Sequence, residues 1–128
     1  MTEESSVIKV QSWLQERHDL ILGKEKAAYA CLNQGDQEGY ARELKAKGEL
    51  LANLAKDARE PLQELPSAVA KALQARLKNF SATAAYGLKL NSLFFLSALL
   101  YKDEHPVGEP DNFQVLIDEF RSKGLAFS

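Results

Sequence analysis

The sequence predicts an all-α protein, an antiparallel bundle of three long helices with a short C-terminal helix. Its prolines stand only at positions 61, 66, 106 and 110, and the segments between them carry apolar residues at helical spacing. No segment alternates apolar and polar residues as a half-buried strand does. A chain of 128 residues fits a single domain, residues 1–128, that buries a core of its own.

The first helix is predicted over residues 5–33, where Ser5 and Ser6 are suited to cap its N-terminus. When successive residues are placed about 100° apart, its apolar side chains fall within an arc of about 120°, the stripe of a core-facing helix. A second apolar line, which includes Trp13 and Leu20, borders this stripe and indicates contact with more than one neighbouring helix. The stripe consists of Val7, Val10, Leu14, Ile21, Leu22, Ala28, Tyr29 and Leu32.

The second helix is predicted over residues 37–59. Gly35 can adopt the left-handed conformation that ends the first helix, and Asp36 can cap the second. So short a connection favours an antiparallel hairpin. Pro61 and Pro66 then stop or kink the helix and turn the chain.

The third helix is predicted over residues 67–101. Beyond Leu90 its surface is apolar on every side, and such a helix end has to be covered. Two polar side chains interrupt the apolar faces. Asn91 in this helix needs a hydrogen-bond partner, whereas Lys47 in the second helix is expected to extend its ammonium group to water.

Residues 102–110 are predicted to form a loop, because two prolines and Gly108 fall within them. Asp111 and Gln114 then have the spacing of a capping box and begin a short helix over residues 112–122, within an amphipathic segment of residues 111–123. The apolar face of this helix and the apolar end of the third helix either cover each other or bind another protein. The candidate partner-binding residues are Leu93, Leu96, Leu100, Phe113, Leu116, Ile117 and Phe120.

The charge and the cysteine content limit the class of partner and the compartment. A formal net charge of −2 and a pI near 5.7 argue against nucleic acid or an acidic membrane as partner. Cys31 is the only cysteine, which excludes an intrachain disulfide and fits a reducing cytoplasm. The acidic N-terminus lacks the features of a secretory signal, and the apolar run 93–101 is too short to span a membrane. We therefore expect a soluble, cytoplasmic protein.

The sequence has no nucleotide-binding, phosphate-loop, zinc-protease or paired-cysteine motif, so we predict no catalytic residue, cofactor or metal ligand set. His18 and Glu25 lie on the apolar face of the first helix, two turns apart. Di-iron bundles use Glu-x-x-His on two helices, and this sequence contains no Glu-x-x-His. A hydrogen-bonded histidine at the core or its boundary is the favoured interpretation of His18.

At the first hairpin the chain reads LNQGDQE (residues 32–38) and then KGELL (residues 47–51). Over the three long helices this resembles the flagellar secretion chaperones of the FlgN kind. The resemblance implies a cytoplasmic export chaperone that binds hook-associated proteins through its C-terminal amphipathic region, here Phe113, Leu116, Ile117 and Phe120. The segment 106–110 departs from the pattern of that family.

We expect a non-catalytic protein-binding bundle, with an export chaperone that binds a partner helix as its concrete form. One alternative is a small structural or regulatory protein that buries the Leu93–Leu100 side in a homodimer interface. A second alternative is a ligand- or metal-binding bundle that uses His18 and Glu25.

Overall fold

The computed structural model describes residues 3–128, and these residues contain no strand. The prediction of an all-α bundle is confirmed. The helices of the described part are α1 (Glu3–Asn33), α2 (Gln37–Ala52), α3 (Leu54–Asp57), α4 (Arg59–Leu62), α5 (Ser67–Leu90), α6 (Leu93–Ala98), α7 (Asn112–Lys123) and the short 3₁₀ helix η1 (Gly124–Ala126).

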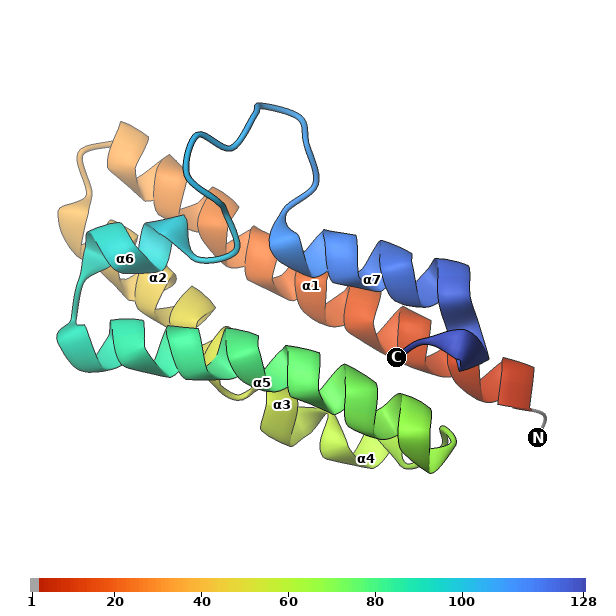
Figure 1. Cartoon of the computed structure of the whole chain (residues 1–128). Coiled ribbons are helices and arrows are strands. Elements are labelled where there is room, and N and C mark those ends of the chain that lie inside the picture. The colour runs from red at the N-terminus through yellow and green to blue at the C-terminus, as the bar shows by residue number, and fades with distance from the viewer. Residues whose placement is uncertain (1–2) are drawn as a thin grey trace.

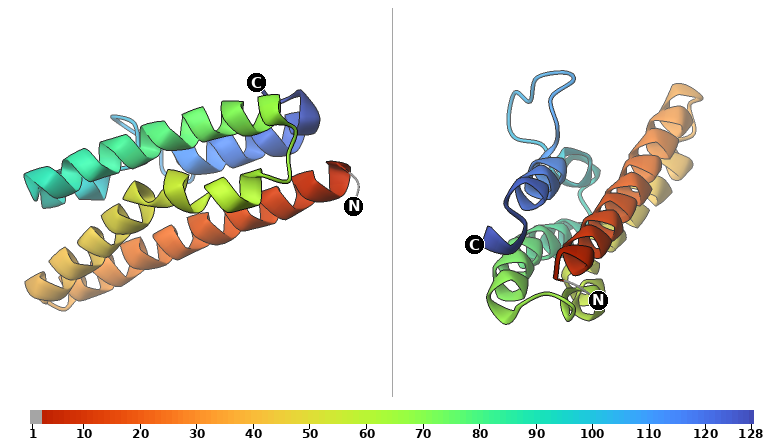
Figure 2. Two further views of the ribbon diagram at one scale, coloured as in Figure 1. Left: turned by 90° about the horizontal axis from the view of Figure 1, so that it is seen from below. Right: turned by 90° about the vertical axis from the view of Figure 1, so that its right-hand side faces the viewer.

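The helices form a bundle in which the chain runs up and down along one axis (Figures 1 and 2). α1 is followed by α2, α3 and α4, which return beside it, and α5 then runs back along the bundle. α6 and α7 follow one another in the direction opposite to α5 and form the last member. The described helices thus form four members: α1, then α2 with α3 and α4, then α5, and last α6 with α7. The second and fourth members are divided into shorter helices.

The core lies between these members and is built from aliphatic and aromatic side chains of all of them. Leu14, Leu44, Leu73, Leu77 and Phe113 are fully enclosed. Complete burial of one such side chain is worth about 1.5–3 kcal/mol, so the periodic apolar stripes of the sequence supply the main stabilisation. No helix among residues 3–128 is long and apolar enough to cross a membrane.

The second member is not one helix over residues 37–59, as predicted, because it breaks at Asn53 and Ala58. The first break is explained by Ser81 of α5. Its hydroxyl donates to the carbonyl of Leu51 (2.8 Å) and accepts from the amide of Ala55 (3.0 Å). These two groups would bond each other directly in a continuous helix, so the inserted hydroxyl opens the helix at this point.

Pro61 lies inside α4 and does not end it. α4 begins anew at Arg59, so Pro61 occupies its first turn, where a backbone N–H has no acceptor within the helix. The corner follows instead at Leu65 and Pro66, and Pro66 directly precedes α5.

The third predicted helix ends at Leu90 and does not reach Tyr101. Asn91 adopts the left-handed conformation (φ 53°) that terminates α5, and Ser92 caps α6 by accepting a hydrogen bond from the amide of Phe95 (3.1 Å). The expectation that Asn91 lies within an apolar face is therefore wrong. Its side chain is exposed, and its role is to end the helix.

The apolar end of the third predicted helix and the apolar face of the C-terminal helix are covered mainly by other helices, and not by each other. α6 packs on α2 and α5, whereas α7 packs on α1. Two glycines allow the close approach of α6, because a Cβ atom on Gly48 would lie 2.8 Å from Leu96 and one on Gly87 would lie 2.6 Å from Phe95. The position of α6 thus depends on the absence of side chains at these two sites.

The Ser81 bridge gives a test of the helix break. Replacing Ser81→Ala leaves the carbonyl of Leu51 and the amide of Ala55 without their shared partner, and we expect the free energy of unfolding to fall by about 1–3 kcal/mol. Urea denaturation measures the change, with Ser12→Ala on the exposed side of α1 as the matched control. Equal stabilities of the two variants would contradict the bridging role of Ser81.

Candidate functional site

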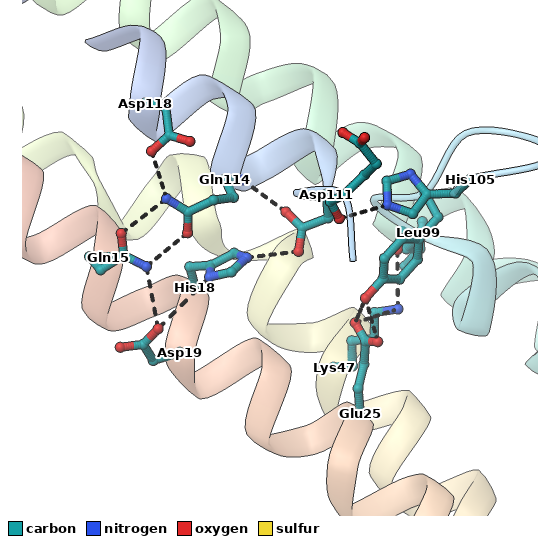
Figure 3. A network of polar contacts seen from close by, with 12 residues as sticks. Gln15, His18, Asp19, Glu25, Lys47, Leu99, His105, Asp111, Gln114 and Asp118 are labelled. Atoms are coloured by element: carbon teal, nitrogen blue, oxygen red, sulfur yellow. Dashed lines mark hydrogen bonds and ion pairs between the residues drawn. The ribbon is translucent and has the colours of Figure 1, made fainter. Parts of the chain in front are cut away.

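Four ionisable side chains are buried among residues 3–128. The exposed fraction is 5% for His18, 6% for Glu25, 0% for Lys47 and 5% for Asp111. Such groups are rarely enclosed unless they are paired, and here they form two clusters (Figure 3). The clusters contact opposite ends of the segment between α6 and α7.

Lys47 holds the first end of this segment. Its ammonium group donates to the carbonyls of Leu99 (3.1 Å) and Ser97 (3.3 Å) and lies 3.4 Å from the carboxylate of Glu25. The expectation that Lys47 reaches water is therefore wrong. The positive charge instead binds carbonyls at and just beyond the C-terminal end of α6, where helices favour a cation.

Glu25 links Lys47 to Tyr101. The Tyr101 hydroxyl donates to both oxygens of the Glu25 carboxylate, at 2.7 and 3.0 Å. Burial, followed by this hydrogen bond and the charge of Glu25, raises the pKa of Tyr101 well above its usual value, so the hydroxyl keeps its proton and remains a donor. Burial also lowers the pKa of Lys47, although the charge of Glu25 opposes that effect.

The other end of the segment is held by Asp111. One oxygen of its carboxylate accepts from the backbone amide of Gln114 (2.8 Å) and so caps α7, as the capping-box spacing predicts. The other oxygen accepts from Nε2 of His18 on α1 (2.7 Å). Gln15 and Gln114 exchange a further hydrogen bond beside this pair (2.9 Å).

The buried pair shifts both of its pKa values. Burial by itself disfavours the charged form of His18, but the hydrogen bond and the charge of Asp111 outweigh it and raise the pKa of His18. Burial likewise opposes the charge on Asp111, yet the hydrogen bonds from His18 and from the amide of Gln114 lower its pKa. Each partner thus favours the ionised form of the other.

The two ends of the segment also meet directly. The amide of Asn112 donates to the carbonyl of Leu100 at 2.8 Å, and this bond closes residues 101–111 into a loop with adjacent ends. We call these residues the anchored loop. Leu100 has a φ of 77°, an unfavourable conformation for a bulky residue, and its side chain is buried.

The middle of the anchored loop projects from the bundle (Figure 1). Pro106 and Glu109 are joined by a backbone hydrogen bond (3.2 Å), with Gly108 at a φ of 87°, and Val107 in this turn is fully exposed. Nε2 of His105 bonds the carbonyl of Glu109 (2.9 Å), and its ring packs edge-on against Tyr101. His105 is therefore half-buried.

The partner-binding residues predicted from the sequence lie inside the bundle. Their apolar side chains belong to the core or border it, and Leu93 alone among them is only half-buried. A partner, or a second copy of the chain, reaches these surfaces only if α6 or α7 moves. The buried members are Leu96, Leu100, Phe113, Leu116, Ile117 and Phe120.

His18 and Glu25 belong to different clusters. His18 pairs with Asp111, whereas Glu25 pairs with Lys47 and Tyr101. No group of three or more histidine, cysteine, aspartate or glutamate side chains in residues 3–128 is arranged to hold a metal ion. The favoured interpretation of His18 as a hydrogen-bonded buried residue is confirmed.

Sequence reasoning found part of this site. It placed His18, Glu25 and Lys47 on or beside apolar helix faces, and three ionisable residues in such positions are a signal of buried pairing. It missed Tyr101 and the second function of Asp111, because their partners lie 76 and 93 residues away in the chain.

In comparisons with known proteins, no protein-family model, curated protein or solved structure matches the chain. The site itself is therefore the basis for a function.

The His18–Asp111 pair predicts a pH dependence of stability. The folded state binds the His18 proton more tightly, so this stabilisation is complete below pH 6.5 and is lost as the pH rises through the raised pKa of His18. The contribution of Asp111 is complete above pH 3.8 and is lost as the pH falls through its lowered pKa.

Urea denaturation across this range tests the pair, with Asp111→Asn as the matched variant. Asparagine still caps a helix but carries no charge, so we expect a smaller loss of stability above pH 6.5 than in the wild type. An equal loss in both proteins would show that another group causes it.

Proposed function

We propose that this chain is a non-catalytic protein-binding bundle in which the anchored loop is the docking element. A single observation carries the proposal. The buried ionisable side chains of α1 and α2 hold both ends of one projecting loop. His18 bonds Asp111 at one end, Glu25 accepts from Tyr101 at the other, and Lys47 binds the carbonyl of Leu99 just before the loop.

The energetics of buried charge support this proposal. Removing charged groups from water costs several kcal/mol per ion, and well-packed apolar residues often stabilise a core equally well or better. Lys47, Glu25, His18 and Asp111 are thus a costly way to stabilise a bundle. The hydrogen bonds of these side chains do fix the direction in which the loop leaves the bundle. Apolar contacts would define that direction less strictly.

The exposed surface of the loop indicates the kind of partner. Val107 offers an apolar contact at the projecting turn, and Asp103, Glu104 and Glu109 outnumber Lys102 around it. A partner surface with a small apolar depression and a basic rim complements this charge. Because the ends of the loop are already fixed, binding costs less conformational entropy than ordering a free segment.

A cytoplasmic secretion or export chaperone that binds a partner helix is the concrete form of this proposal, and the resemblance to flagellar chaperones supports it. The apolar face implied by that resemblance is buried against α1. In our proposal the loop that precedes α7 therefore makes the first contact with the partner.

Site-specific photocrosslinking tests the docking element. A benzoylphenylalanine at position 107 should capture a discrete protein in cells of the source organism, whereas the same group at the half-exposed position 115 of α7 should not. Val107→Asp should then weaken binding of the purified partner by at least about tenfold without changing thermal unfolding. The matched control, Val115→Asp, should bind normally.

Two results would overturn this assignment. One is capture from position 115 and not from position 107. The other is equal affinity of Val107→Asp and the wild type for the captured protein.

A further inference from the structure

A half-open cavity of about 400 Å³ lies over α5 between α6 and α7. It exists because α6 ends at Ala98 and α7 begins at Asn112, so the fourth member of the bundle leaves this stretch of α5 without a helix above it. The walls come from α5, from α6 and residues 99–101 that follow it, and from Asn112 at the start of α7, and Leu51 of α2 also lines the cavity. The volume lies within the range of small-molecule sites, about 300–1,000 Å³.

The chemistry of the walls restricts the ligand. Phe80 and Phe95 contribute aromatic rings, Leu51, Leu99 and Leu100 contribute aliphatic groups, and the lining contains no aspartate, glutamate, lysine, arginine or histidine from the described residues. A charged ligand would lose its hydration here without gaining a counter-ion. The cavity therefore selects an uncharged and largely apolar molecule.

The mouth of the cavity supplies hydrogen-bonding groups. The side-chain amides of Asn79 and Asn112 are exposed there and form no hydrogen bond to any residue in the described range 3–128. The hydroxyl of Thr83 is already engaged, because it donates to the carbonyl of Asn79 at 2.9 Å. A hydroxyl or carbonyl group at the outer end of a ligand could bond either amide.

The cavity is also held open by the buried network. Lys47 binds the carbonyl of Leu99, and the amide of Asn112 binds the carbonyl of Leu100, whose backbone is kept in its left-handed conformation. These bonds fix the wall formed by residues 99–100, so it cannot relax into the space. Small-molecule sites are usually preformed in this way, with apolar walls and few polar groups.

We propose that this cavity binds a small, uncharged molecule with an aromatic or alicyclic body and one hydrogen-bonding group at its outer end. This inference does not depend on the docking role of Val107, which lies in another part of the loop. An aromatic side chain of a partner protein is the competing occupant, and the experiment distinguishes the two.

Fluorescence titration with N-phenyl-1-naphthylamine tests the site, because this uncharged aromatic amine becomes bright in apolar surroundings. We expect saturation at one molecule per chain and shifts of the backbone amide signals of Phe80, Thr83 and Asn112 in NMR spectra.

Ala98→Trp should fill the cavity and weaken binding at least about tenfold. Thr83→Trp fills it from α5 and should have the same effect. Ala82→Trp, at an exposed alanine outside the cavity, should bind like the wild type.

A parallel titration with N-acetyl-tryptophanamide represents the side chain of a partner protein. Saturable binding of the naphthylamine that both filling variants weaken supports the proposal. Binding without saturation, binding that neither filling variant weakens, or binding of the tryptophan derivative alone would overturn it.

Discussion

Burial of the Lys47 ammonium group determines how the second half of this chain is arranged. A fully enclosed cation must find partners, and these come from α1 as the carboxylate of Glu25 and from the carbonyls of Ser97 and Leu99. Tyr101 completes the cluster by donating to Glu25. One side chain of α2 thereby fixes α1, α6 and the start of the anchored loop relative to one another.

The pair of His18 and Asp111 does the same at the other end of the loop, where one carboxylate both caps α7 and binds α1. Loss of one member of a buried pair leaves the other uncompensated and typically costs about 3–5 kcal/mol. Hydrogen bonds of this kind are directional, so they restrict the geometry more than apolar contacts do. They therefore explain why the loop is positioned at both ends while its centre projects, and why the adjacent cavity keeps its shape.

Much of the fold follows from local sequence, but the breaks and the site do not. The stripe of α1 as far as Ala28 and the cap at Asp111 depend on neighbouring residues, and both were predicted. The last two residues of the predicted stripe, Tyr29 and Leu32, are exposed. The break at Asn53 requires a hydroxyl from α5, and apolar periodicity continues through Asn91 although the helix does not. Lys47 was expected in water because its partners come from two other helices, and sequence spacing does not reveal which helices meet.

Native-state hydrogen exchange of the Asn112 amide tests most directly whether Lys47 fixes the loop, because this amide closes it on Leu100. In the wild type we expect strong protection, close to that of Leu77 in the middle of α5. In Lys47→Met, exchange at Asn112 should accelerate at least about tenfold more than exchange at Leu77. An unprotected Asn112 in the wild type, or an equal acceleration at both amides in the variant, would contradict the account.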